Sequence, residues 1–509
     1  MAESIRCVPE KSIITGWDFS TGAVKCLAFD LSGKTVAEVR MPTDLWTANG
    51  VSELNLLQLE GQAYASTRAI ANKLRELGRL KDWIAGGISA THHTSGRIDK
   101  HIQQVRRAIC WNDHSLAKYN EDGLKRLGGQ AKAIEFTGGP WAIRYSLSHL
   151  LKDEQHLPNA EWERTWKILS HGSLCAGYLT GEFSKTSPSC AASTGIMDLR
   201  TNHWRKEMLN AIENPRYREL AWQQLPEIVS ADEPLGQLSL SLSLENGIAA
   251  AQRPWIFPTS DDQQAGLAGG GASEPGQIAI ILGNSAVVNS SSSGFPSEGN
   301  LDVMKLNWGP YLWMRCYNNG AQFLDKVVGE NPDWNALEHG ARNVSAGCNG
   351  TMVLPFTSPE PSLGIHQPRW EWIGSEPKMP AEKFRASLEA LACLATLGVL
   401  AHEKAGQKIQ RISVSGGIAR SELMCEILAS MLNKPLMRLE SFEGPALGAA
   451  TAAFSSLEKM LRARAGIKEP FTIADGMASM IRFKGETKPN PAWVGPYQEV
   501  LKTFQARIQ

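Results

Sequence analysis

Apolar residues follow two different spacings along the chain, one typical of strands and one typical of helices. Short apolar runs at 13–14 and 24–29 flank the polar segment 18–22, which predicts a strand–turn–strand unit. Residues 56–77 carry the period of a long amphipathic helix, and 83–88 form the next buried strand. Repeated alternation of this kind is typical of α/β proteins.

The same order of elements returns after residue 257. Apolar runs at 278–282 and 286–288 again flank a short polar turn, 283–285. Two halves with the same opening predict two α/β domains, 1–257 and 258–509, with a cleft between them. Other predicted elements are helices at 165–179, 381–402, 421–432 and 444–454, a strand at 412–415, a loop at 290–294, and peripheral closing helices after 457.

Charge and composition exclude several classes of protein. The chain has 509 residues, and its 52 Lys and Arg balance its 52 Asp and Glu, which argues against a dedicated nucleic-acid or anionic-membrane binder. No uninterrupted apolar run approaches the length of a membrane span, and residues 1–11 lack the apolar core of a secretory signal. Nine scattered Cys without a Cys-x-x-Cys pair predict free thiols and a cytoplasmic location.

Three turns rich in small residues could bind phosphate or nucleotide. The turns around Asp18 and Asn284 can direct backbone amides at phosphate oxygens, but each taken alone is better explained as an ordinary hairpin. Gly416-Gly417 lies between a strand and a helix, where backbone can approach a purine or ribose closely. Three glycine-bearing turns in this order favour a nucleotide site over three unrelated turns.

Polar residues after buried strands are candidates for chemistry. Asp261 and Asp262 open the small-residue segment after 257, where one can cap a helix and the other can accept a hydroxyl proton. An extended His92-His93 pair would point to opposite faces, so it is a poor metal pair, and a structural histidine is the alternative to a sugar contact. Trp111-Asn112-Asp113 offers a stacking ring with acceptors, or simply a buried Trp beside a polar turn.

Together these segments resemble the FGGY family of carbohydrate kinases from about residue 12 to residue 505. The opening is similar to the family's first phosphate motif in its eukaryotic xylulokinase-like form. The other matching segments are the sugar-binding His93-Thr94-Ser95, the sugar-contacting Trp111-Asn112-Asp113, the landmarks 179–183 and 193–195, the catalytic segment 262–266, the second phosphate turn 283–285, the adenosine motif 413–421 and the helix 446–450 behind it.

The resemblance implies two ribonuclease-H-like domains of the actin and hexokinase type, with ATP and Mg²⁺ used to phosphorylate a terminal sugar hydroxyl. It makes Asp262 the base that accepts the hydroxyl proton and Asp18 the metal-binding residue. The implied sugar-binding residues are His93, Trp111, Asp113, Asp262 and Gln263. The implied ATP-binding residues are Ser20, Thr21, Lys25, Gly283, Asn284, Ser285, Gly416, Gly417, Ile418 and Ser421.

Four positions depart from the family pattern. Ser20 replaces a glycine, Asn284 a threonine, Ser187 an Asp found in many relatives, and Ser115 an Arg common in bacterial members. We expect a ketopentose kinase that converts D-xylulose to its 5-phosphate, with D-ribulose, L-ribulose and related polyols as alternative substrates. A catalytically silent sugar- or ATP-binding sensor on the same fold is the alternative function. The expected partner is a small-molecule sugar, with no nucleic acid and no membrane, and a homodimer is allowed.

Overall fold

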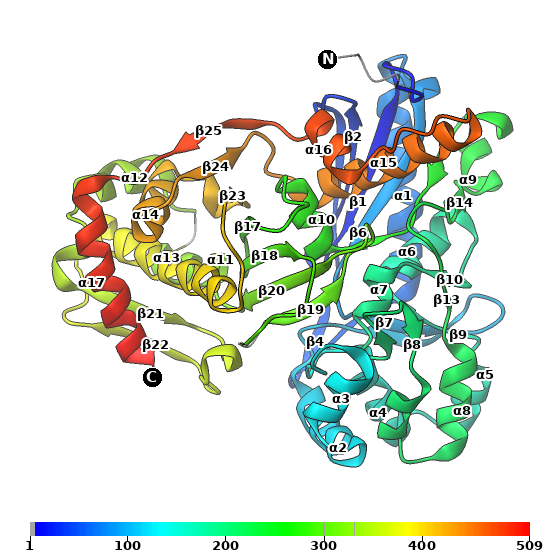
Figure 1. The fold of residues 1–509 in the computed structure, drawn as a ribbon, viewed down its shortest axis with the longest axis horizontal. Helices are drawn as coiled ribbons and strands as arrows, with labels where there is room; N and C mark the ends of the chain where they lie inside the picture. The colour runs from blue at the N-terminus through cyan, green and yellow to red at the C-terminus, as the bar shows by residue number, and fades with distance from the viewer. Residues whose placement is uncertain (1–5, 299–300, 330, 509) are drawn as a thin grey trace. The chain divides into compact units, whose positions relative to one another are not determined.

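The computed structural model describes residues 6–298, 301–329 and 331–508 (Figure 1). They form two compact units that are discontinuous in sequence. The first contains the chain up to Gly269 with Val303–Tyr311 and Pro445–Ile481, and the second contains the segments between these and the C-terminal end from Arg482. The sequence predicts two domains, 1–257 and 258–509, and this division stays a prediction.

The first unit is built on a mixed sheet in the order β14-β15-β6-β1-β2-β3. At its centre β1 (Ile13–Phe19) pairs antiparallel with β2 (Ala23–Asp30) and parallel with β6 (Trp83–Ala90). Every residue of β1 is buried, which explains its almost continuous apolar sequence. The predicted strand–turn–strand at the N-terminus is therefore confirmed.

Helices cover this sheet in Figure 1. The long helix α1 (Leu56–Glu76) packs against β2 and β3, and α6 (His171–Thr180) packs against β6 and α1. α15 (Gly444–Arg464) approaches so closely that a Cβ on Gly16 would lie 1.9 Å from the Ala446 carbonyl oxygen. Glycine on the strand thus allows the small-residue helix to rest directly on the backbone of the sheet.

The second unit has its own mixed sheet, with neighbouring strands β20-β18-β17-β23-β24-β25. Here β17 (Gln277–Leu282) pairs antiparallel with β18 (Ala286–Ser292) and parallel with β23 (Arg411–Ser415). This repeats the pairing pattern of β1, β2 and β6, and it confirms the second strand–turn–strand unit that the sequence predicted. The core helix α13 (Pro380–Lys404) packs against β18 and against α11, α12 and α14.

The remaining elements complete the two units. The strands are β3 (Thr35–Pro42), β4 (Trp46–Ala48), β5 (Val51–Leu54), β7 (Ser95–Ile98), β8 (Gln104–Ile109), β9 (Lys167–Ser170), β10 (Lys185–Thr186), β11 (Met197–Asp198), β12 (His203–Trp204), β13 (Glu227–Ile228), β14 (Gly236–Gln237), β15 (Trp255–Ile256), β16 (Ser260–Asp261), β19 (Asp302–Lys305), β20 (Tyr311–Tyr317), β21 (Met352–Phe356), β22 (Arg369–Ile373), β24 (Leu436–Leu439) and β25 (Phe483–Thr487). The helices are α2 (Ala117–Leu127), α3 (Gln130–Thr137), α4 (Ser146–His156), α5 (Asn159–Arg164), α7 (Pro188–Ala192), α8 (Pro215–Gln224), α9 (Leu240–Glu245), α10 (Asp262–Gly269), α11 (Ala321–Val328), α12 (Trp334–Arg342), α14 (Glu422–Leu432), α16 (Ile473–Met480) and α17 (Pro491–Ile508).

Two predicted elements were wrong in part. The helix expected at 165–179 is a strand, β9, followed by α6, because residues 167–170 pair with β7 at the edge of the five-stranded sheet β4-β5-β8-β7-β9. The loop expected at 290–294 belongs largely to β18, where the serines are buried. The Ser290 hydroxyl is satisfied inside the protein, since its Oγ lies 2.8 Å from His402 Nδ1 and accepts a hydrogen bond from Gln407.

The C-terminal region and α13 also differ from expectation. After residue 457 the chain does not contribute helices alone, because β25 joins the edge of the second sheet by pairing with β24. Among the described residues, α13 is long and apolar enough to cross a membrane, although its apolar sequence is interrupted by polar residues. In its most apolar stretch 83% of the residues are buried inside the protein, which is the burial of a core helix.

Candidate active site

Asp18 lies at the end of β1, and residues of two other strands of the first unit, β6 and β16, lie beside it in register. It pairs in register with Ser89 of β6, and Ser89 pairs in turn with Ser260 of β16. The Ser89 hydroxyl donates a hydrogen bond of 3.0 Å to Asp18 Oδ1. The carboxyl ends of these parallel strands therefore gather Asp18 and the segment that begins α10 at one edge of the sheet.

Two adjacent carboxylates stand at the start of α10. Asp261 is 2% exposed, and its Oδ1 accepts hydrogen bonds of 2.9 Å from the backbone amides of Gln263 and Gln264. Asp262 is partly exposed, and its Oδ1 accepts a hydrogen bond of 3.0 Å from the His92 backbone amide. Asp261 thus satisfies the free amides of the helix terminus, which confirms the predicted cap. Asp262 does not cap the helix, and its acceptance of a hydroxyl proton stays a prediction.

The surroundings of Asp262 make its carboxylate more basic. Burial of the carboxyl group, followed by the charge of Asp261 and a smaller contribution from Asp18, raises the pKa of Asp262 to about 7. Hydrogen bonds from the His92 amide and from Gln263 Nε2, at 3.2 Å, oppose this rise. A pKa near the working pH is the property that a general base requires.

His93 adopts a left-handed backbone conformation, with φ of 54°, and is 3% exposed. Its Nδ1 lies 3.1 Å from the Ser193 carbonyl oxygen, so Nδ1 carries the proton of the neutral ring. Burial, and then the neighbouring His92, lower the pKa of His93 well below its usual value, which keeps the ring neutral. Among the described residues Nε2 has no hydrogen-bond partner, and it is left as an acceptor.

The two histidines do not point to opposite faces, as an extended pair would. Their rings stack with centroids 3.8 Å apart, and Tyr145 stacks on the other side of His93 at 4.5 Å. The positive φ of His93 bends the backbone out of the extended conformation and brings the rings together. Tyr145 was not identified from the sequence, because nothing local relates position 145 to position 93.

The predicted sugar-binding segment 111–113 divides between an accessible part and a buried part. Trp111 and Asn112 are partly exposed, whereas the side chain of Asp113 is fully buried. Asp113 Oδ1 accepts from the backbone amide and hydroxyl of Ser115, and Oδ2 lies 2.9 Å from Lys152 Nζ. Lys152 on α4 therefore supplies a cation beside Ser115, and sequence reasoning missed it.

The first predicted phosphate turn is held by hydrogen bonds between its own residues. Its first residue, Ser20, donates its hydroxyl to the Ala23 carbonyl and its backbone amide to the same oxygen, at 2.8 and 3.0 Å. Thr21 is partly exposed in the middle of the turn, and Lys25 lies directly opposite Asp18 across the β1–β2 pair. The turn is thus a compact hairpin bend beside Asp18.

In the second unit the other phosphate turn and the adenosine motif come together. Gly283, Asn284 and Ser285 connect β17 to β18, and the Gly283 carbonyl accepts from the amide of Ala321 at the start of α11, at 2.8 Å. Gly416 follows the neighbouring strand β23 with φ of 95°, and a Cβ there would lie 2.3 Å from the Leu282 carbonyl oxygen. Only glycine permits this approach of the two turns.

The other predicted ATP-binding positions follow Gly416. Gly417 is exposed, whereas the side chain of Ile418 belongs to the hydrophobic core of the second unit. Ser421 Oγ accepts a hydrogen bond of 3.1 Å from the Met424 amide and so caps α14. Through these positions the chain offers backbone and the N-terminal end of a helix rather than charged side chains.

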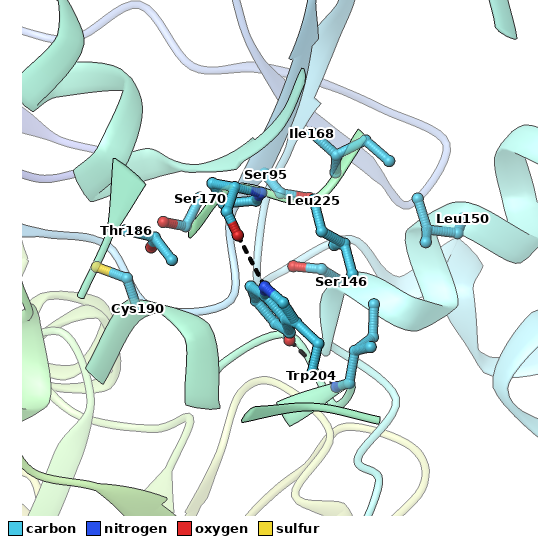
Figure 2. A pocket seen from close by; sticks show the side chains of 12 residues that line it. Ser95, Ser146, Leu150, Ile168, Ser170, Thr186, Cys190, Trp204 and Leu225 are labelled. Carbon is cyan, nitrogen blue, oxygen red and sulfur yellow. Dashed lines mark hydrogen bonds between the residues drawn. The ribbon is translucent and has the colours of Figure 1, made fainter. Parts of the chain in front are cut away.

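The first unit also contains a small internal cavity (Figure 2). Figure 2 shows hydroxyl groups and apolar side chains around it, with the Trp204 indole nitrogen donating to the Pro226 carbonyl at 2.7 Å. The cavity is lined by Ser95, Ser146, Leu150, Ile168, Ser170, Thr186, Cys190, Thr194, Ile196, Trp204, Leu225 and Pro226. Ser95 of the predicted sugar-binding segment lines it, but His93, Trp111, Asp113, Asp262 and Gln263 do not, so it is not the candidate site.

Comparisons with known proteins agree with this arrangement. Residues 13–269 match the FGGY family of carbohydrate kinases, N-terminal domain, and residues 330–457 match its C-terminal domain. The chain is 27% identical over 453 residues to the xylulose kinase of Escherichia coli (strain K12), covering 86% of this chain and 89% of the relative. It is 26% identical over 473 residues to the glycerol kinase of Geobacter sp. (strain M21), covering 86% and 88%.

Solved structures share the fold. The gluconate kinase and the ligand-bound xylulose kinase from Lactobacillus acidophilus each superpose with a TM-score of 0.81 at 19% identity, covering 97% of this chain and 97% of theirs. The expected α/β fold with two sheets, of the actin and hexokinase type, is therefore confirmed.

Proposed function

Because the chain belongs to the FGGY family of carbohydrate kinases, we propose that it phosphorylates a ketopentose and that D-xylulose is its best substrate. It is a sugar kinase that takes its phosphate from ATP. Xylulose kinases recur among the relatives of this chain, and glycerol kinases are less frequent among them. This supports D-xylulose over glycerol as the substrate.

The observation that carries the proposal is the position of Asp262. Its carboxylate projects from the start of α10, is held by the His92 amide, and has a pKa raised to about 7. In the proposed reaction it accepts the proton of the terminal sugar hydroxyl while that oxygen forms a bond to the γ-phosphorus of ATP. The bond between the γ-phosphorus and the bridging oxygen breaks, and ADP leaves with that electron pair.

Neighbouring residues are proposed to orient the sugar. His93 Nε2 is a buried acceptor, so it suits a hydroxyl that donates a hydrogen bond. Trp111 is accessible for stacking on the sugar, and Gln263 lies beside Asp262. Asp113 is proposed to act through Lys152, because its own oxygens are already occupied by Ser115 and Lys152.

The phosphates are proposed to bind at the glycine-bearing turns. Backbone amides around Ser20, Thr21, Asn284 and Ser285 are suited to the developing negative charge, and Gly416-Gly417 to the adenosine. Ser20 keeps its hydroxyl inside the turn, which leaves backbone rather than side chain for the phosphate. Asp18 is a buried carboxylate of the hard-oxygen type that Mg²⁺ prefers, and Mg²⁺ bound there would neutralise phosphate charge.

Release of ADP with a panel of substrates tests the proposal. D-xylulose, D-ribulose, L-ribulose, glycerol and D-gluconate are compared at equal enzyme concentration, and D-xylulose is expected to give the highest kcat/KM. A higher kcat/KM for another compound would replace D-xylulose as the substrate. Tight sugar binding without ADP release from any compound would favour the silent sensor instead.

A further inference from the structure

The first carboxylate of the pair, Asp261, has no part in the proposed chemistry, yet it is the more highly connected of the two. Its Oδ1 binds two backbone amides of α10, and its Oδ2 accepts a hydrogen bond from the hydroxyl of Ser189 on α7. Its backbone amide donates back to Ser189 Oγ at 3.1 Å. Asp261 therefore links two short helices through one carboxylate.

Asn307 extends this network on the far side of Ser189. Asn307 Oδ1 accepts from the Ser189 amide at 3.0 Å, and the Asn307 amide donates to Gln264 Oε1 at 2.5 Å. Gln264 in turn donates through Nε2 to Ser260 Oγ at 2.8 Å. The start of α10 is thus fixed on both sides by residues from separate segments of the first unit.

Asp261 is not a substitute for the base. It is 2% exposed and already accepts three hydrogen bonds, whereas Asp262 is partly exposed and accepts hydrogen bonds from the His92 amide and Gln263. Since the two residues are adjacent, any rotation of the Asp261 peptide changes the direction in which Asp262 projects.

We propose that Asp261 is a positioning residue, whose carboxylate joins α7 to the start of α10 and thereby holds Asp262 in the orientation needed for proton transfer. This inference rests on the proposed function of Asp262. Small displacements of a reacting group lower the rate of the chemical step much more than they change substrate binding. Loss of the link should therefore lower kcat with little effect on KM.

Three variants separate orientation from charge. Asp261→Ala removes every contact of the carboxylate, and we expect kcat to fall by about tenfold or more, with KM for ATP and sugar within about threefold of wild type. Asp261→Asn keeps an oxygen that can cap α10, so kcat should return to within about threefold of wild type. Ser189→Ala removes only the link to α7 and should lower kcat less than Asp261→Ala does.

Asp333→Ala is the matched control. Asp333 caps the exposed start of α12 by accepting from the Ala336 amide at 3.0 Å, so its loss weakens a helix without touching the site. We expect this variant to keep wild-type kcat. Thermal unfolding of every variant identifies any that fails to fold, in which case Ser189→Ala and Asp261→Asn carry the test.

The possible failures are distinguishable. An active wild type with unchanged kcat in Asp261→Ala, or in Ser189→Ala where Asp261→Ala does not fold, would overturn the positioning role alone. The same conclusion follows if Asp261→Asn is as slow as Asp261→Ala, because the negative charge would then be the active property. A wild type inactive with every sugar would overturn the proposed function, and the positioning role with it.

Discussion

At the scale of single residues, the chemistry depends on how buried groups alter their neighbours. Asp262 differs from an ordinary surface aspartate because it is surrounded by buried groups and stands beside a second carboxylate. His93 differs from an ordinary histidine because Ser193 fixes its tautomer and burial keeps it neutral. The raised pKa makes the Asp262 carboxylate a stronger base, and the neutral ring leaves His93 Nε2 as a hydrogen-bond acceptor.

The raised pKa of Asp262 predicts the pH dependence of the kinase. Below about pH 7 the carboxyl group is protonated and cannot accept the hydroxyl proton, so kcat/KM should fall as pH decreases, by about tenfold per unit. An unperturbed aspartate would keep full activity down to about pH 4 to 5. Initial rates between pH 5 and 9 check this, with circular dichroism confirming that the protein stays folded, and a flat profile down to pH 5 would contradict it.

Removal of the base gives a second prediction. Asp262→Ala should lower kcat by about a hundredfold or more while KM for ATP stays within about threefold, because in the proposed reaction the carboxylate accepts the hydroxyl proton and does not bind the nucleotide. Steady-state kinetics with ATP and D-xylulose measure both constants, and Asp333→Ala is again the control. Near-normal kcat would mean that another group is the base.

At the scale of elements, close contact between helices holds α10 and its first residue in place. A Cβ on Gly448 of α15 would lie 1.8 Å from the Ala265 carbonyl oxygen and 2.6 Å from the Gly269 amide nitrogen, both in α10. Neither backbone atom can move away without displacing that helix. The small-residue sequence of α15 is therefore a requirement of packing against α10 and against β1.

Gly448→Ala should consequently weaken both stability and activity. We expect a loss of about 1–3 kcal/mol in the free energy of unfolding, because a methyl group must be inserted into a filled contact. We also expect a lower kcat, since the displaced helix carries Asp262. Gly61→Ala in α1 is the matched control, because nothing lies within 4 Å of its added Cβ and a helix favours alanine over glycine. Equal thermal stability of Gly448→Ala and wild type would contradict the packing argument.

The sequence correctly predicted those elements whose own spacing of apolar residues is enough to distinguish a helix from a strand. The long helix at 56–77 and the strand at 278–282 are observed at 56–76 and 277–282. The strand at 167–170 and the buried serines of β18 were missed, because neither has an apolar pattern and each is stabilised by partners distant in sequence. Pairing with a neighbouring strand or a buried histidine overrides a local preference for helix or loop.

At the scale of the whole molecule, the burial of the nine cysteines shows how the protein is packed around them. All nine lie in the described part of the chain and none of them forms a disulfide there; seven are buried, and Cys7 and Cys316 are partly exposed. Burial also raises the pKa of several, including Cys26 and Cys175, which disfavours the reactive thiolate. This arrangement agrees with the prediction, made from the sequence, that the cysteines are thiols rather than disulfides.

Titration with a thiol reagent tests this arrangement. We expect at most two thiols of the native protein to react quickly and nine to react after denaturation, without added reductant. Fewer than nine in denaturant would reveal disulfides or oxidised thiols. More than two in the native state would show that the buried cysteines become exposed more readily than the structure indicates.

The sequence by itself determined the α/β class, the repeated strand–turn–strand opening and the position of Asp262 after a buried strand. These features follow from local periodicity and from residue types at short spacing. Both can be seen within a single segment of the chain. Tertiary structure alone decided that Asp261 binds Ser189, that Lys152 pairs with Asp113, and that Tyr145 stacks on His93. These contacts join residues 39 to 72 positions apart, and such partners are selected by the packing of whole elements, which no local pattern encodes.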